Sequence, residues 1–235
     1  MQLPFFYTEQ MADAASTISL NEETSRHVVN VLRMKAGEQL HLTNGKGNLV
    51  TAEIVNNYKK HCEVIIKKVS MLPTSDRQVT IAISLLKNAS RFEWFLEKAT
   101  EIGVTAIIPL LCERTERQHF RKDRMEGLLI SAMLQSRQSW LPELREPMKF
   151  NSYINEPYQD SNLFIAHCAE EDKRPLHVQI RASPHSHILI GPEGDFTRKE
   201  IEQALERKFI PVSLGNTRLR SETAAIAAVT LLMLL

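Results

Sequence analysis

Short apolar stretches alternate with helical segments over the last two thirds of the chain, and this alternation limits the fold more than any other feature. The stretches expected to be strands are 79–85, 104–110, 163–166, 187–190 and 210–214; the expected helices are 91–102, 122–138, 198–207 and 222–235. Strands that alternate with helices form a parallel sheet, because each helix returns the chain to the same end of the sheet. This part is therefore predicted to be an α/β domain with helices on both faces.

The first third of the chain has a different pattern, which is rich in β-structure. Strands are expected over 39–43, 49–55 and 62–69, and the turn at 44–48 contains the Asn-Gly pair typical of a hairpin. Asn21 is a plausible N-cap for the one helix expected here. The segment 70–78, which contains Pro, Ser and Asp, is the best candidate for a linker. We therefore expect a small β-barrel domain over 1–72 and the α/β domain over 73–235.

The composition excludes several classes of protein. Of 235 residues, 43% are hydrophobic and 24% are charged, which excludes a disordered chain or a collagen-like repeat. Lys and Arg number 29 against 28 for Asp and Glu, so the net charge of +1 excludes a polybasic-tail protein. A local basic cluster at 114–124 has two interpretations: a patch that contacts phosphates, or a solvated surface held by salt bridges.

Cysteine usage and the apolar stretches indicate where the protein works. Cys62, Cys112 and Cys168 are odd in number and far apart, so we expect reduced thiols and neither a disulfide framework nor a zinc site. Residues 1–10 lack the basic start and apolar run of a signal peptide. The apolar stretch 224–235 is shorter than the roughly 20 residues that a bilayer-spanning helix needs. The expectation is a soluble, cytoplasmic protein.

The loop over 188–196 is the first candidate for a ligand site. A buried strand runs directly into Gly191-Pro192-Glu193-Gly194, and a helix follows. Ligands of open α/β sheets bind beyond the carboxyl ends of the strands, and glycines let the backbone approach a ligand closely. The alternative is a simple turn with Pro at its second position.

The loop over 214–224 is the second candidate. It places Arg218 and Arg220 directly before an apolar helix, where cations oppose the helix dipole. Cations in this position suggest an anionic ligand such as a phosphate or a carboxylate. Ser221 is expected to cap the helix, and Glu222 complements the positive end of its dipole.

Other sequence motifs for chemistry are absent. The chain has no phosphate-binding G-x-x-x-x-G-K-[ST] loop and no G-x-S-x-G nucleophile turn. His185 and His187 form a pair without a clear third ligand, so no metal is expected.

The two loops together resemble the SPOUT methyltransferases. G-P-E-G at 191–194 and L-G-x-x-x-L-R-x-E-T-A at 214–224 are most similar to the bacterial small-subunit rRNA (uracil-N3) methyltransferase family. The segment 87–104 resembles the family's K-x-x-x-[KR]-x-E-W-x-x-x-K-A-T-E-L-G-V block. Gln-Ser at 135–136 with Leu-Pro-Glu at 141–143, and Val-Leu-Arg at 31–33 before Gly-Glu at 37–38, also agree with the family pattern.

The resemblance implies a fold and an activity. It implies a PUA-like β-barrel that binds RNA, followed by a methyltransferase domain whose last helix is threaded into a deep trefoil knot. It implies a homodimer that binds S-adenosylmethionine and, without a metal, methylates N3 of a specific uridine in the 16S rRNA of the small ribosomal subunit.

The resemblance also assigns expected roles to residues. Arg220 would stabilise charge on the uracil, and Glu222 would act either as a general base or as a helix-capping residue. The residues expected to bind the cofactor are Ile190, Gly191, Pro192, Glu193, Gly194, Leu214, Gly215, Leu219, Ala224 and His167. Those expected to bind RNA are Lys87, Arg91, Arg114, Arg117, Arg137 and Arg33.

The chain departs from the family pattern at four places. Asp195 replaces the last glycine of G-P-E-G-G-F, and His167-Cys168 replaces a His-Pro pair. An arginine of the second loop is shifted by one position, to Arg218, and Arg137 precedes Gln138 where the family has Gly-Arg. Two other functions stay open on the sequence: a ribosome assembly factor that binds RNA without catalysis, and a SPOUT enzyme that acts on tRNA.

Overall fold

The computed structural model describes residues 2–10, 13–116, 118–169 and 173–235. Contacts divide the chain into two compact units. The first consists of Met1–Thr74 with Met133–Leu141, and the second of Ser75–Ala132 with Pro142–Leu235. The segment 133–141, which the expected boundary assigns to the second domain, thus belongs by its contacts to the first unit.

The first unit is built on one five-stranded sheet, whose order is β1-β3-β4-β5-β2. Its core consists of alternate residues of the strands, such as Leu40, Leu42, Val50 and Ile54, which are fully buried. The three expected strands are confirmed, and Asn21 caps the expected helix by accepting a hydrogen bond from the Thr24 N–H. The elements are β1 (Phe5–Tyr7), β2 (Thr17–Ser19), α1 (Glu22–Arg26), the π-helix η1 (His27–Val31), β3 (Gln39–Thr43), β4 (Asn48–Asn57) and β5 (Cys62–Met71).

The turn between β3 and β4 explains why 133–141 joins this unit. Gly47 has φ +83°, and a Cβ there would lie 2.3 Å from the ring of Trp140, so the indole occupies the space that a side chain would need. The Trp140 Nε1–H donates to the Leu72 carbonyl at 3.2 Å, and the Leu141 N–H donates to the Gly45 carbonyl at 2.8 Å.

The second unit contains an eight-stranded sheet of order β11-β13-β10-β12-β6-β7-β8, with β9 also paired to β7. Among the described residues, the strands of this sheet all pair in parallel, as expected for an α/β domain. Its strands are β6 (Gln78–Ser84), β7 (Ala106–Leu111), β8 (Glu143–Leu144), β9 (Met148–Lys149), β10 (Ser161–Ala166), β11 (Arg174–Pro175), β12 (His185–Ile190) and β13 (Ile210–Ser213). The helices are α2 (Ala89–Ile102), α3 (Lys122–Gln135), α4 (Phe150–Ile154), α5 (Leu176–Gln179), α6 (Arg198–Glu206) and α7 (Ser221–Leu234).

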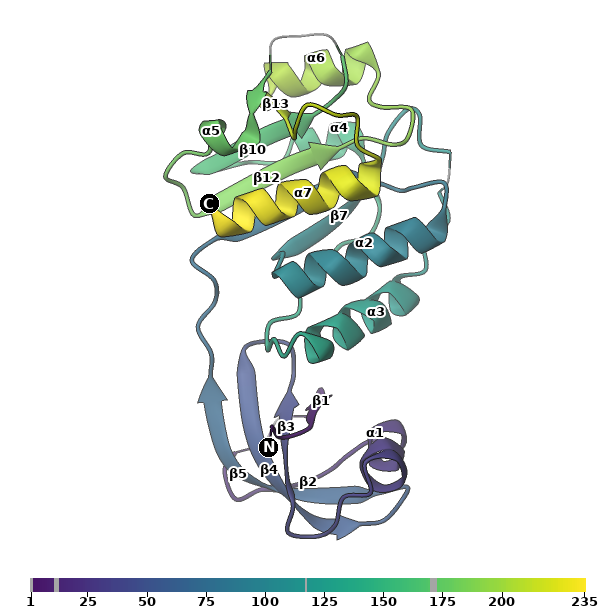
Figure 1. The fold of residues 1–235 in the computed structure, drawn as a ribbon, viewed down its shortest axis with the longest axis vertical. Coiled ribbons are helices and arrows are strands. Elements are labelled where there is room, and N and C mark those ends of the chain that lie inside the picture. The colour runs from purple at the N-terminus through teal and green to yellow at the C-terminus, as the bar shows by residue number, and fades with distance from the viewer. Residues whose placement is uncertain (1, 11–12, 117, 170–172) are drawn as a thin grey trace. The chain divides into compact units, whose positions relative to one another are not determined.

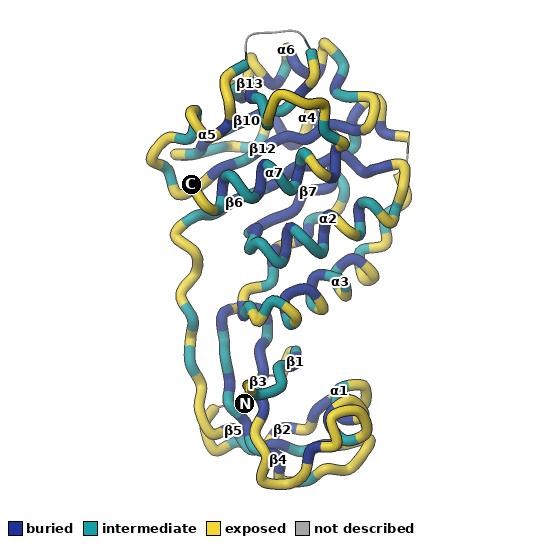
Figure 2. Tube along the Cα trace, in the orientation of Figure 1, coloured by how far each residue is buried: buried dark blue, intermediate teal, exposed yellow. Residues whose placement is uncertain are grey.

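Helices cover both faces of this sheet, which confirms the prediction. Figure 1 shows α7 in front of β12, with α2 beside α7, and α7 contacts β6, β12 and α2. On the other face, Phe150 and Tyr153 of α4 and Ile201 of α6 form a core with Ala82 and Leu189 of the strands. The central strands are accordingly buried along most of their length (Figure 2).

Several boundaries follow from local chemistry, and three differ from expectation. Gly103 ends α2 at φ +98°, and Thr197 begins α6 with a capping box to Glu200. Strand β7 covers 106–111 instead of the expected 104–110, and it contains Pro109 because β8 pairs only with 106–107 and β9 only with 110–111 on that edge. Helix α3 ends at 135, three residues before the expected end. The N-cap of α7 is Arg220 instead of Ser221, and its side chain makes no capping bond.

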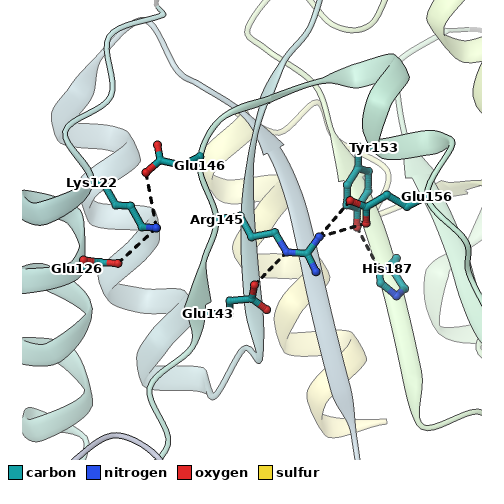
Figure 3. Close-up of polar contacts among 8 residues, drawn as sticks. All are labelled: Lys122, Glu126, Glu143, Arg145, Glu146, Tyr153, Glu156 and His187. Carbon is teal, nitrogen blue, oxygen red and sulfur yellow. Dashed lines mark hydrogen bonds and ion pairs between the residues drawn. The ribbon is translucent and has the colours of Figure 1, made fainter. Parts of the chain in front are cut away.

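A polar network ties α4 to the amino-terminal half of β12 (Figure 3). The Tyr153 hydroxyl lies 3.0 Å from His187 Nδ1, and Arg145 binds Glu143 at 3.1 Å and Glu156 at 3.2 Å. Burial, and then the charges of His185 and Arg145, lower the pKa of His187 to about 4. The His187 imidazole is therefore neutral near pH 7 and serves packing, in a region away from the strand ends that form the site.

None of the helices in the described part of the chain combines the length and apolar character that crossing a bilayer requires.

Candidate functional site

A pocket of about 630 Å³ lies at the carboxyl ends of β10, β12 and β13. Strand β10 lies between the other two, so the chain goes from β10 to β12 on one side and then to β13 on the other. Such a reversal of direction leaves a crevice where ligands bind in open α/β sheets. Both loops singled out in the sequence line this pocket.

The loop after β12 forms one wall, which contains Ile190, Gly191, Pro192 and Glu193. Gly191 is buried, and a Cβ there would lie 3.1 Å from the backbone nitrogen of Phe196 and 3.2 Å from its ring. Glycine leaves room for this close approach of two backbone segments, which a side chain would crowd. The backbone of the wall therefore packs directly on Phe196.

The loop after β13 forms the opposite wall with Leu214, Gly215 and Leu219, and Ala224 of α7 completes it. Arg218 and Arg220 also line the pocket and are exposed. Within the described ranges, neither side chain makes a hydrogen bond or an ion pair. With the positive end of the α7 dipole beside them, the two guanidinium groups can bind an anionic group or stabilise a developing negative charge.

The loop after β10 closes the pocket from a third side. His167 is buried in its wall, and Cys168 and Lys173 also line it. The Lys173 ammonium donates to the His167 carbonyl at 2.5 Å and to the Ala169 carbonyl at 2.8 Å. Lys173 thus holds the segment that follows β10 through two backbone carbonyls.

Asp195 links two of these loops. Its φ of +62° is left-handed, a conformation that glycine adopts freely and Asp tolerates better than most residues. Its Oδ1 accepts the Phe196 N–H at 2.9 Å, and its Oδ2 accepts the Cys168 N–H at 2.8 Å. Asp195 and Cys168 are both departures from the family pattern, and they depend on each other. The family's proline at the position of Cys168 has no N–H that could donate to Asp195.

Replacing Asp195 with alanine is expected to weaken S-adenosylmethionine binding about tenfold, because two hydrogen bonds to a charged acceptor are lost and the left-handed backbone becomes less favourable. Titration calorimetry measures the affinity. Asp160→Ala is the matched control, since Asp160 also has positive φ and lies outside the pocket lining. An unchanged affinity in Asp195→Ala would show that the link does not shape the site.

A second layer of residues holds the 191–194 turn in place. The Lys87 N–H donates to Glu193 Oε1 at 3.1 Å, and the Lys87 ammonium pairs with Glu116 at 2.8 Å. Arg114 Nη1 donates to the Gly194 carbonyl at 2.6 Å. Gly194 is not among the residues that line the pocket, and a Cβ there would face the Arg114 side chain at 3.4 Å. Lys87 and Arg114, which were expected to bind RNA, thus brace the turn.

Glu222 lies behind the pocket wall and does not line it. The residue is 7% exposed, and its Oε1 is 3.7 Å from Nε of Arg91 on α2. Glu222 Oε2 has no hydrogen-bond partner within the described ranges. Glu222 was expected to act in catalysis and Arg91 to bind RNA. The structure instead places them in one ion pair, which joins the N-terminal turns of α2 and α7.

The remaining residues expected to bind RNA lie elsewhere. Arg33 and Arg137 belong to the first unit, and both have left-handed backbones, with φ of +56° and +58°. Arg117 lies outside the described residues. Sequence reasoning did not place several pocket-lining residues at the cofactor site, although each lies at the end of one of the same strands or in the segment after it: Ala166, Cys168, Lys173, Asp195, Val212, Ser213, Asn216, Thr217 and Ser221.

The pocket fits a nucleoside with a charged tail. Its volume is in the range of small-molecule sites, and Ile190, Val212, Leu214 and Leu219 supply apolar surface for a flat base. Close by, burial raises the pKa of the Cys112 thiol to about 12, so this cysteine is not a nucleophile near pH 7. Among the described residues, no group of His, Cys, Asp and Glu is arranged to hold a metal ion.

Comparisons with known proteins agree with this site. Residues 73–233 match the family model for an RNA methyltransferase domain, and residues 20–67 match that for an RNA methyltransferase PUA domain. A ribosomal RNA small subunit methyltransferase E from Synechocystis is 30% identical over 94% of this chain and 73% of its own length. One from Buchnera aphidicola is 27% identical over 99% of this chain and 96% of its own length.

A solved structure gives a similar result. The crystal structure of a ribosomal RNA small subunit methyltransferase E from Neisseria gonorrhoeae, bound to S-adenosyl methionine, superposes with a TM-score of 0.88. It is 30% identical and covers 97% of this chain and 95% of its own.

Proposed function

Because this chain belongs to the ribosomal RNA small subunit methyltransferase E family of RNA methyltransferases, we propose that it methylates N3 of a specific uridine in 16S rRNA, using S-adenosylmethionine. The observation that carries the proposal is the pocket at the ends of β10, β12 and β13, which both family loops line.

The pocket walls suit the cofactor. Ile190, Leu214, Leu219 and Ala224 supply apolar contacts, and the backbone beside Gly191 approaches closely enough to bind through its own polar groups. When bound, S-adenosylmethionine supplies a methyl group on a sulfonium, an activated donor that needs no metal.

Arg220 is the group best placed to help the reaction. Uridine N3 carries a proton, and its loss to solvent leaves negative charge on O2 and O4 of the base. Arg220 is exposed, lines the pocket and lies at the N-terminus of α7, so it adds positive potential where that charge develops.

Glu222 is proposed to position the site and not to accept the proton. Its carboxylate is buried, pairs with Arg91 and lies outside the pocket lining. A base must come within hydrogen-bond reach of the proton that it removes. The ion pair with the partly exposed Arg91 instead fixes the start of α7, and with it the backbone that carries Arg220.

The domains are proposed to divide the work as the resemblance implies. Residues 1–72 hold the RNA, and residues 73–235, with the trefoil knot, bind the cofactor and catalyse transfer. The target base must be unstacked to enter the pocket, so contacts elsewhere on the RNA have to fix its position. The proposed location is the cytoplasm, where ribosomal subunits are assembled.

The protein is proposed to act as a homodimer. Ile226 and Leu231 of α7 are only partly buried, Leu234 is exposed, and Trp94 on the neighbouring α2 is 44% exposed. A second copy would cover this apolar surface. Light scattering at micromolar concentration is expected to give about twice the chain mass of 26.9 kDa. A monomeric mass would contradict the proposal.

Methyl transfer to different RNAs tests the proposed substrate. With methyl-labelled S-adenosylmethionine, label is expected in small ribosomal subunits that lack the modification, and not in tRNA. Label in tRNA would favour a tRNA enzyme, and cofactor-free RNA binding without transfer would favour an assembly factor. Either result would overturn the proposal.

A further inference from the structure

The turn between β4 and β5 exposes an aromatic ring together with cations. Tyr58 is 69% exposed, and Lys59, Lys60 and His61 are exposed as well. The His61 N–H donates to the Tyr58 carbonyl at 3.1 Å, and the Tyr58 N–H donates to Asn56 Oδ1 at 3.2 Å. The backbone of the turn is thus held by its own hydrogen bonds, while the side chains contact solvent.

A second basic segment lies beside this turn. Asn57 Nδ2, at the end of β4, donates to the Met34 carbonyl at 3.5 Å. This contact brings Arg33 and Lys35, both exposed, to the same end of the sheet. We call Arg33, Lys35, Tyr58, Lys59, Lys60 and His61 the hairpin-end surface. The turn and the segment that follows η1 are exposed in Figure 2.

The cations of the hairpin-end surface are not neutralised. Two other cations of this unit have acidic partners: Lys67 pairs with Glu53 at 3.1 Å and Arg26 with Glu22 at 2.6 Å. No ion pair within the described ranges involves Arg33, Lys35, Lys59 or Lys60. The neighbouring carboxylates accept hydrogen bonds from uncharged groups. Glu38 accepts one from the Lys35 backbone N–H at 2.6 Å, and Glu63 accepts one from Asn56 Nδ2 at 3.2 Å.

The backbone at Arg33 supports a role for its side chain. Arg33 follows the π-helix η1 and has φ +56°, a conformation in which glycine is favoured. π-helical turns are rare and occur often at functional sites. The guanidinium of Arg33 is exposed and makes no ion pair within the described ranges, so it is available to a ligand outside the chain.

We propose that the hairpin-end surface binds the ribosomal RNA substrate. Lys59, Lys60 and Arg33 contact phosphates, and Tyr58 stacks on an unpaired base. Cations next to an exposed aromatic ring are the combination that single-stranded RNA requires, because phosphates need charge and unstacked bases need a flat apolar partner. This inference rests on the proposed function and identifies the contact surface of its substrate.

The double variant Lys59→Ala/Lys60→Ala tests the phosphate contacts. For 16S rRNA freed of proteins, the slope of log affinity against log salt concentration is expected to fall in magnitude by about 1.4–1.8, because two phosphate contacts are lost. Lys67→Ala/Lys68→Ala, on the same unit, is the matched control and should keep the wild-type slope. S-adenosylmethionine affinity should be unchanged in both variants.

Tyr58→Ala tests the stacking contact separately. RNA affinity is expected to fall about tenfold with the salt slope unchanged, since an uncharged contact is lost. A wild-type affinity and slope in Lys59→Ala/Lys60→Ala would overturn the proposal. So would a defect seen only with intact small subunits, which would indicate a protein partner. These experiments measure RNA binding and not methyl transfer. A failure of the proposed activity would appear in the methyl-transfer assay alone, so the two failures can be distinguished.

Discussion

Arg220→Ala is expected to lower the single-turnover rate of methyl transfer about 100–1000-fold, the loss typical when one charge-stabilising donor is removed. S-adenosylmethionine affinity should change much less, because the apolar and backbone walls of the pocket remain. Rapid-quench measurement with saturating cofactor and RNA isolates the chemical step. Arg218→Ala, which removes the other exposed arginine of this loop, is the matched control and should retain most of the rate.

Glu222→Gln is the companion variant. It keeps the shape of the buried side chain but removes the charge that faces Arg91 at 3.7 Å. A positioning role predicts lower thermal stability with a retained rate. A rate loss that recovers as pH rises would instead identify Glu222 as the base. Near-normal rates in Arg220→Ala would contradict the role of Arg220 and direct attention to Arg218 and Arg114.

Gly191→Val is expected to weaken S-adenosylmethionine binding about 100-fold. Its Cβ alone would lie 3.1 Å from the Phe196 nitrogen, so the loop must move. Overpacking of this kind costs about 1–3 kcal/mol, and about 3 kcal/mol corresponds to roughly 100-fold in affinity. Calorimetry measures binding, and circular dichroism verifies the fold.

The matched control for this variant is Gly127→Val. Gly127 lies on α3, and a Cβ there would meet no atom within 4 Å. Its cofactor affinity should equal that of the wild type. A folded Gly191→Val protein with unchanged affinity would show that the 191–194 turn does not shape the pocket.

Features that depend on local sequence were predictable. The caps at Asn21 and Thr197 and the end of α2 at Gly103 follow from neighbouring residues, and so do the long strands. The pocket was predictable for a related reason. Parallel strands end at one edge of a sheet, so loops that follow them meet wherever the strand order reverses.

Features that depend on distant partners were not predictable. The short strands β8, β9 and β11 have two residues each and exist only through pairing with their neighbours. The 133–141 segment joins the first unit because Trp140 packs on Gly47. The bond from Cys168 to Asp195 joins residues 27 positions apart, and nothing in either local sequence indicates it.

Nucleoside analysis of the methylated product tests the central claim most directly. Small subunits that lack the modification are incubated with the protein and S-adenosylmethionine, and the 16S rRNA is digested and analysed by mass spectrometry. The account predicts 3-methyluridine at a single position, and its absence from the Arg220→Ala reaction at early times. A methyl group on another atom or another base, or no methylated nucleoside at all, would contradict it.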